Sequence, residues 1–229
     1  MKLKLFRFLP FVLAAFTLSS CDLDDDSGTY YPPNPNIAFG IIANASPDSG
    51  DLYFYADSNQ INNAALNYPG AAGYYNFYLG NRTFKLEDAL GNELATTQLT
   101  LEQGDYFSLF AVNTFSNIEL IAYTDALEYP ASGNSRIRFI NLTVDAPFVT
   151  IANGTEPLAN DLEFKDATEF IEIESGVYNL TYSDTNGDEL FVQAAEFKPG
   201  RIYTIYTKGY VTPPTGSNDT FSTKTILNY

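Results

Sequence analysis

The residues able to do chemistry in this 229-residue chain are mainly carboxylates and tyrosines. The sequence contains no histidine, and Cys21 is its single cysteine beside 28 acidic and 12 basic side chains. Ser-His-Asp and Cys-His catalysis need a histidine, and the usual zinc sites need histidine or several cysteines. Hydrolysis by those routes is therefore excluded, and we expect no cofactor, no metal site and no catalytic residue.

Paired carboxylates could still act on a glycosidic bond, because glycosidases need only two acids flanking it. Glu172 and Glu174 share one face of the stretch EFIEIESG, and Ile171 and Ile173 share the other. A half-buried strand with one solvated face produces the same alternation without any catalytic role. We favour the strand interpretation and keep a carboxylate-type enzyme acting on glycans as the alternative.

The stretch DTNGDE places Asp184, Asn186 and Asp188 at alternate positions, like the first ligands of a calcium loop. The familiar loop has glycine sixth and a bidentate glutamate twelfth, whereas glycine is fourth here and Ala195 is twelfth. Asn186-Gly187 instead predicts a tight hairpin turn, since both residues accept a positive φ.

Four tyrosines, Tyr68, Tyr74, Tyr75 and Tyr78, crowd around YPGAAGYYNFYLG and form a candidate ligand patch. Exposed tyrosine rings can stack on sugars or anchor a protein partner. The same pattern also permits Tyr75 and Phe77 to be core residues. The sequence leaves both interpretations open.

The formal net charge of −16 limits the partners of the protein. A nucleic-acid partner requires a positive face, which the few scattered cations cannot supply. Binding to an anionic head-group surface is disfavoured for the same reason.

Residues 1–20 have the pattern of a secretory signal peptide: a basic start, an apolar run and small residues before Cys21. The sequence Leu18-Ser19-Ser20-Cys21 resembles the lipobox of bacterial lipoproteins, in which the cysteine receives a diacylglyceryl group. That resemblance implies that Cys21 is lipidated and attaches the protein to a membrane, because two or more acyl chains give stable anchoring.

An acidic and proline-rich segment, 21–36, follows the lipobox and is expected to act as a tether. Its aspartates are Asp22, Asp24, Asp25 and Asp26. An acidic cluster at this place resembles a surface-export signal of the Bacteroidota, and an aspartate directly after the cysteine resembles an inner-membrane retention signal of enteric bacteria. We favour an outer-membrane protein exposed at the cell surface over one facing the periplasm.

An internal repeat indicates a duplicated domain. NASPDSGDLYFY from Asn44 aligns with NLTVDAPFVTIA from Asn141, LGNEL at 90–94 with NGDEL at 186–190, and GDYFSLFA at 104–111 with GRIYTIYT at 200–207. We therefore expect two domains, at 37–130 and 135–229, joined near the turn-forming residues 129–134.

Each copy contains about seven short apolar or alternating stretches, which favours an all-β fold of two tandem immunoglobulin-like antiparallel β-sandwiches. In the second copy, Ile137 and Phe139 alternate with Arg136 and Arg138, so we expect one apolar and one solvated face. In the first copy, strands are expected at 37–43, 52–56, 74–78, 83–86, 94–100, 106–112 and 118–123.

The motifs carry a family resemblance. RFINLTVDAPFVTI at 138–151, NASPD at 44–48, GVYNLTYSD and KPGRIYTIY resemble strands and turns of the bacterial domain-of-unknown-function 4397 family. The second copy departs from the usual Ser-Pro-Asp by reading Thr143-Val144-Asp145. The resemblance implies a fold and an envelope location, and supplies no catalytic site. We expect a non-catalytic binding or structural module whose partner is an envelope glycan or another envelope protein.

Overall fold

The computed structural model describes residues 36–229, which fold as sixteen strands and one 3₁₀ turn. The signal peptide, Cys21 and residues 22–35 lie outside the described residues. The first repeat, here called repeat 1, contains β1 (Ile37–Asn44), β2 (Tyr53–Ala56), β3 (Asn59–Gln60), β4 (Gly70–Tyr78), β5 (Gly80–Glu87), β6 (Glu93–Leu101), β7 (Tyr106–Val112), η1 (Phe115–Asn117) and β8 (Glu119–Thr124). Among the described residues, no helix is long and apolar enough to cross a membrane.

The second repeat, repeat 2, has the same eight-strand pattern. Its strands are β9 (Asn134–Asn141), β10 (Phe148–Asn153), β11 (Glu156–Glu163), β12 (Ile171–Glu174), β13 (Gly176–Ser183), β14 (Glu189–Phe197), β15 (Ile202–Lys208) and β16 (Ser222–Leu227). Sequence reasoning expected about seven strands in each copy. In repeat 1 the missed strand is β3, whose two residues are too few to produce an alternating pattern.

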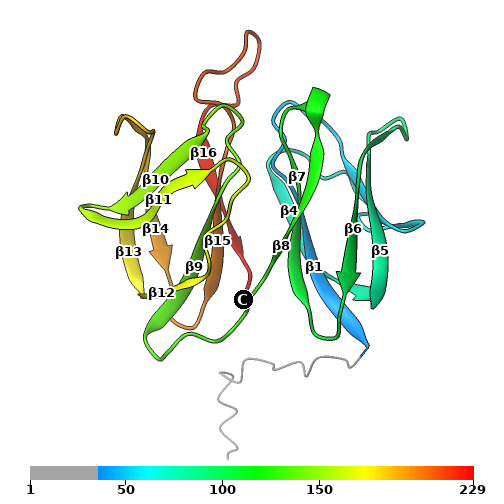
Figure 1. The fold of residues 1–229 in the computed structure, drawn as a ribbon, viewed down its shortest axis with the longest axis horizontal. Helices are drawn as coiled ribbons and strands as arrows, with labels where there is room; N and C mark the ends of the chain where they lie inside the picture. Colours follow the sequence, from blue (N-terminus) through cyan, green and yellow to red (C-terminus); the bar gives the residue numbers. More distant parts are fainter. Residues whose placement is uncertain (1–35) are drawn as a thin grey trace, which may run out of the picture. The chain divides into compact units, whose positions relative to one another are not determined.

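Each repeat is a sandwich of two four-stranded sheets, which confirms the predicted fold class (Figure 1). The strand orders are β4-β1-β7-β8 and β3-β2-β5-β6 in repeat 1, and β12-β9-β15-β16 and β11-β10-β13-β14 in repeat 2. The sheets are not purely antiparallel, because β1 pairs with β7 and β9 pairs with β15 in parallel. Alternating side chains indicate strands but carry no information about the direction in which two strands pair.

Each sandwich encloses its own apolar core. In repeat 1 the rings of Phe77, Phe84 and Phe107 pack together with centroids 5.3–5.6 Å apart. Gly40 of β1 is required beneath them, since a Cβ there would lie 2.4 Å from the Phe107 ring. Repeat 2 has a matching core around Phe139, Leu180 and Phe197.

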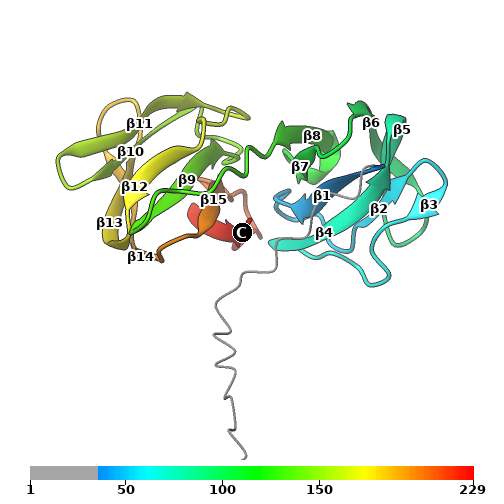
Figure 2. The ribbon, with the colours of Figure 1, turned by 90° about the horizontal axis from the view of Figure 1, so that it is seen from below.

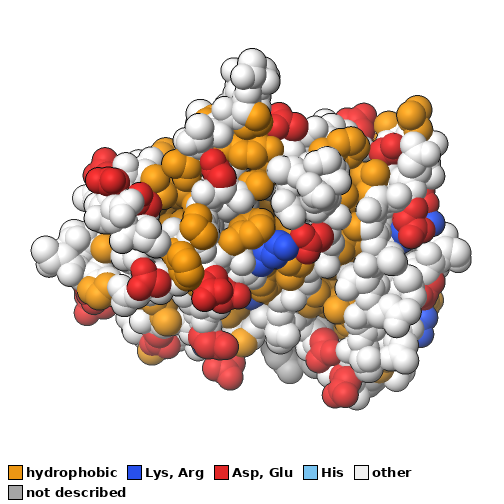
Figure 3. Space-filling model, turned by 45° about the horizontal axis from the view of Figure 1, so that its top comes forward, with side chains coloured by type: hydrophobic (Ala, Val, Ile, Leu, Met, Phe, Trp, Pro, Cys, Tyr) orange, Lys and Arg blue, Asp and Glu red, His pale blue; other side chains and the backbone are white. Residues whose placement is uncertain are grey.

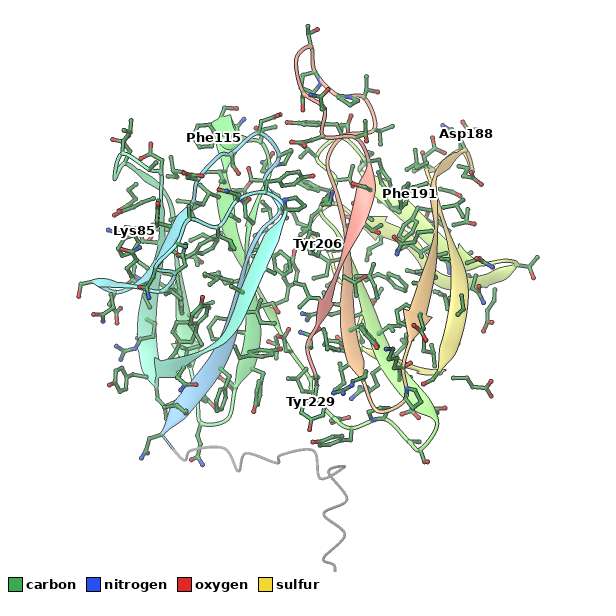
Figure 4. All side chains as sticks on the ribbon, turned by 180° about the vertical axis from the view of Figure 1, so that it is seen from behind. Lys85, Phe115, Asp188, Phe191, Tyr206 and Tyr229 are labelled. Atoms are coloured by element: carbon green, nitrogen blue, oxygen red, sulfur yellow. The ribbon has the colours of Figure 1, made fainter. Side chains whose placement is uncertain are left out.

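A third core lies between the repeats, which form one compact unit. It contains Ile41 and Phe110 of repeat 1 and Ile140, Leu142 and Tyr206 of repeat 2. Figure 4 shows Tyr206 between the two inner sheets, and Figures 1 and 2 show β1 and β7 facing the side of β9 and β15. The central strands of both inner sheets are therefore buried on both faces.

The prediction that Arg138 lies on a solvated face of its strand is wrong, because that face is buried in the contact between the repeats. The Arg138 residue is 2% exposed, because the face that alternates with Ile137 and Phe139 packs against repeat 1. Its guanidinium donates to the Asp125 carboxylate, to the Thr124 carbonyl at 2.8 Å and to Thr204 Oγ1 at 3.0 Å.

The buried Asp125 carboxylate accepts further hydrogen bonds from both repeats. Its Oδ2 receives the Tyr74 hydroxyl at 2.7 Å, the Ser108 hydroxyl at 2.8 Å and Asn228 Nδ2 at 3.4 Å. We call Arg138, Asp125, Tyr74, Ser108, Thr204 and Asn228 the inter-repeat network. A buried charge pair is tolerated only with such additional hydrogen bonds, so the network favours one arrangement of the two inner sheets.

Candidate functional site

The two glutamates considered as a catalytic pair lie on a half-buried strand, and Glu172 makes structural hydrogen bonds. Glu172 and Glu174 lie in β12, where their alternating exposure is that of a half-buried strand. Glu172 Oε1 accepts hydrogen bonds from Asn134 Nδ2 at 2.6 Å and from the Ala131 backbone N–H at 3.2 Å. Glu172 therefore holds the segment that enters β9.

The stretch DTNGDE forms the turn between β13 and β14, as predicted. Asp184 Oδ1 accepts the backbone N–H groups of Asn186 at 2.8 Å and Asp188 at 2.9 Å, and these bonds lower the pKa of Asp184. Asp88 makes the same turn in repeat 1 by accepting the N–H groups of Leu90 and Asn92. No group of three or more metal-ligating acidic side chains is found within residues 36–229.

The four candidate tyrosines lie in different environments. Tyr74 belongs to the inter-repeat network, where burial and the neighbouring Asp125 charge raise its pKa. The Tyr68 ring has the Lys208 ammonium 5.2 Å from its centroid. Tyr75 packs against the core of repeat 1, whereas Tyr78 is 78% exposed. The four tyrosines therefore divide between core packing and exposure, and Tyr75 and Tyr78 line a common surface feature.

That feature is a groove of about 370 Å³ at one side of repeat 1, here called the β3–β4 groove. Edge strand β4 contributes Tyr75, Asn76 and Tyr78, and the short strand β3 contributes Asn59 and Gln60. β4 and β3 are edge strands of the two different sheets of repeat 1, so the groove lies at an edge of the sandwich. The volume lies near the lower end of the range of small-ligand pockets, about 300–1,000 Å³.

Arg82 and Asp57 also line the groove, and they form an ion pair with no net charge. Arg82 Nη1 donates to Asp57 Oδ2 at 2.8 Å, and Arg82 Nη2 donates to the Leu79 carbonyl at 2.8 Å. Asp57 Oδ1 also accepts the Thr83 backbone N–H at 3.0 Å. The Thr83 N–H and the Arg82 guanidinium together lower the pKa of Asp57, so this carboxylate stays ionised at neutral pH.

The arrangement can hold a small polar molecule with an apolar face. Aromatic rings offer contact area, and amide side chains both donate and accept hydrogen bonds. Sequence reasoning found the tyrosines but missed Asp57, Asn59, Gln60 and Arg82. These residues meet through the β2–β3 hairpin and the neighbouring strand β5, and no short motif in the sequence signals that approach.

Residues 41–152 match the model of the family described as Domain of unknown function (DUF4397), which confirms the resemblance drawn from the motifs. The match starts in β1 and ends in β10, so it covers all of the β3–β4 groove and crosses into repeat 2. The family description names no activity. No curated protein matches the chain.

Comparison with solved structures gives distant likenesses. The C-terminal domain of AlgF from P. aeruginosa is 14% identical, with 42% of this chain and 98% of that chain covered and a TM-score of 0.29. A leucine-rich repeat protein from Bacteroides thetaiotaomicron is 13% identical, with 78% and 26% covered and a TM-score of 0.22. A candidate cell adhesion protein from Bacteroides eggerthii is 9% identical, with 85% and 96% covered and a TM-score of 0.21. Similarity this low carries no functional argument.

Proposed function

We propose that this protein is a non-catalytic, lipid-anchored binding module of the bacterial cell envelope. The observation that carries the proposal is the β3–β4 groove, which combines two tyrosines, three amide side chains and an internally neutralised ion pair. Ligand pockets have this composition, with apolar and aromatic walls and a few polar groups that fix orientation. The ligand in this proposal is an envelope glycan or a segment of another envelope protein.

The charge state of the groove supports binding without catalysis. A carboxylate-type glycosidase needs two acids, one of them protonated and one ionised. Within the described structure, Asp57 is the sole carboxylate among the groove's lining residues, and Arg82 and the Thr83 N–H stabilise its ionised form. The alternative, a glycan-acting enzyme, would have to place its two acids elsewhere.

The anchor in this proposal is the acylated Cys21, and segment 21–36 holds the sandwiches away from the membrane. The resemblance of Leu18-Ser19-Ser20-Cys21 to a lipobox supports this part of the proposal. The substitution Cys21→Ala should abolish incorporation of a labelled fatty acid and move the protein out of the membrane fraction. Persistent labelling of the variant would contradict lipidation at this residue.

Exposure at the cell surface has its own test. Protease treatment of intact cells, with a lysed control, should remove the protein if Asp22, Asp24, Asp25 and Asp26 act as an export signal. Survival until lysis would place the protein on the periplasmic side, and the acidic segment would then serve as a tether or retention signal.

A further inference from the structure

We propose that the β3–β4 groove of repeat 1 binds a neutral glycan and excludes anionic ones. This inference rests on the proposed function, since it names the ligand class of the same groove. It follows from a difference between the two repeats. They share strand order and turns but differ at the positions that line the groove.

Strand pairing fixes which residues correspond. Tyr78 of β4 pairs with Ile37, and Glu174 of β12 pairs with Asn134, which is the counterpart of Ile37 at the repeat offset of 97 set by Asn44 and Asn141. The register therefore equates Tyr75, Asn76 and Tyr78 with Ile171, Glu172 and Glu174, in that order.

The residues that β3 contributes to the groove can be compared with repeat 2 in the same way. Asn59 pairs with Ala56, and Glu156 pairs with Asn153, so the hairpins equate Asn59 with Glu156 and Gln60 with Pro157. Repeat 2 thus has three glutamates where repeat 1 has two amides and a tyrosine ring. A carboxylate only accepts hydrogen bonds, whereas an amide both donates and accepts and so matches the hydroxyl groups of a sugar.

The fixed charges of the groove indicate that the glycan is neutral. Among the described lining residues, Arg82 is the one cation, and its guanidinium is bonded to Asp57 and to the Leu79 carbonyl. The chain carries a net charge of −16, and on the face shown in Figure 3 acidic side chains are scattered while basic ones are sparse. An anionic glycan would meet like charge without a cation free to neutralise it.

The apolar contact would come from Tyr78. Tyr78 is 78% exposed and lines the groove, so its ring can cover the apolar face of a pyranose, while Tyr75 is fixed by packing against the core. Edge strand β4 also presents backbone polar groups on the side away from β1, which adds donors and acceptors.

The chain itself supplies the test substitution. The double variant Asn76→Glu/Tyr78→Glu places the residues of repeat 2 in β4, and β12 shows that this fold accepts them. The full-length protein in detergent would be run in affinity electrophoresis through gels containing dextran, galactomannan or soluble starch as neutral glycans, and polygalacturonate or chondroitin sulfate as anionic ones. Tyr129→Ala, which removes a 59% exposed tyrosine outside the groove, is the matched control.

We expect at least one neutral glycan to retard the wild type and the Tyr129→Ala variant, and no anionic glycan to do so. The double variant should lose affinity by roughly tenfold or more while keeping the thermal unfolding temperature of the wild type. Unchanged retardation of the double variant would overturn the groove assignment and leave a binding module with a different site. Retardation by anionic glycans alone would overturn the charge argument. No retardation by any glycan would overturn the glycan ligand and leave a protein partner for the proposed module.

Discussion

Arg138 of repeat 2 and Asp125 of repeat 1 form an ion pair whose side chains are 2% and 0% exposed. The pair is enclosed by hydrogen bonds from Tyr74 and Ser108 on one side and by Thr204 on the other. The mainly apolar contact between the two sandwiches therefore has a polar centre.

Removal of one partner of this pair should be costly. The substitution Asp125→Ala leaves the Arg138 guanidinium buried without its counter-ion, and the expected loss of unfolding free energy is about 3–5 kcal/mol. Urea unfolding followed by circular dichroism measures this loss. Glu128→Ala is the control, because Glu128 pairs with Arg136 at 83% exposure and should contribute only about 0–1 kcal/mol. Equal losses for the two variants would contradict the role of the inter-repeat network.

The duplicated asparagine at the end of the first strand of each repeat should be a second stability determinant. Asn141 is fully buried, donates to the carbonyls of Ala146 and Leu162, and accepts from the Thr207 hydroxyl at 2.9 Å. Asn141→Ala leaves these groups without a partner, so we expect a loss of about 2–3 kcal/mol in urea unfolding.

Asn44 is the counterpart in repeat 1. It is also fully buried, and it donates to Ser49 Oγ and to the Leu66 carbonyl. Asn44→Ala should give a loss similar to that of Asn141→Ala, and the exposed Asn160→Ala should be within about 0.5 kcal/mol of the wild type. A neutral result at both buried positions would refute the structural role of this residue.

Ligand binding should not depend on pH over the neutral range. The Thr83 N–H and the Arg82 guanidinium lower the pKa of Asp57 from its usual 3.8. The Asp57–Arg82 pair is therefore present above that value and is lost as the pH falls through the lower pKa of the folded protein. The affinity for the glycan found by electrophoresis should be constant from about pH 8 to about pH 5. A steep change within this range, measured by titration calorimetry, would show that another titrating group controls the site.

The strands could be predicted from the sequence because alternation of apolar and polar residues reports the two faces of a sheet. The burial of Arg138 could not be predicted, since alternation does not show whether the polar face of a strand contacts water or another sheet. For the other side of the contact, the nearly continuous apolar runs of Ile37–Asn44 and Tyr106–Val112 in repeat 1 are typical of strands buried on both faces.

The candidate site was only partly predictable for a related reason. Tyr75 and Tyr78 attracted attention as aromatic residues, but Tyr74, their neighbour in the same strand, points into the inter-repeat network. Asp57 and Arg82 are 25 residues apart, and they meet because β2 and β5 are paired in one sheet. The strand pairing in the structure reveals that contact. The pairing also shows that the two repeats differ at the residues that line the groove.

The most direct test of a non-catalytic binding module is a titration of the full-length protein with the neutral glycan that it binds, with reducing ends assayed in the same samples. Because repeat 2 lacks the groove residues, we expect saturable binding at one site per chain and no new reducing ends after prolonged incubation. Release of reducing ends would show that the protein is an enzyme, and two equal sites per chain would contradict the assignment of binding to the β3–β4 groove.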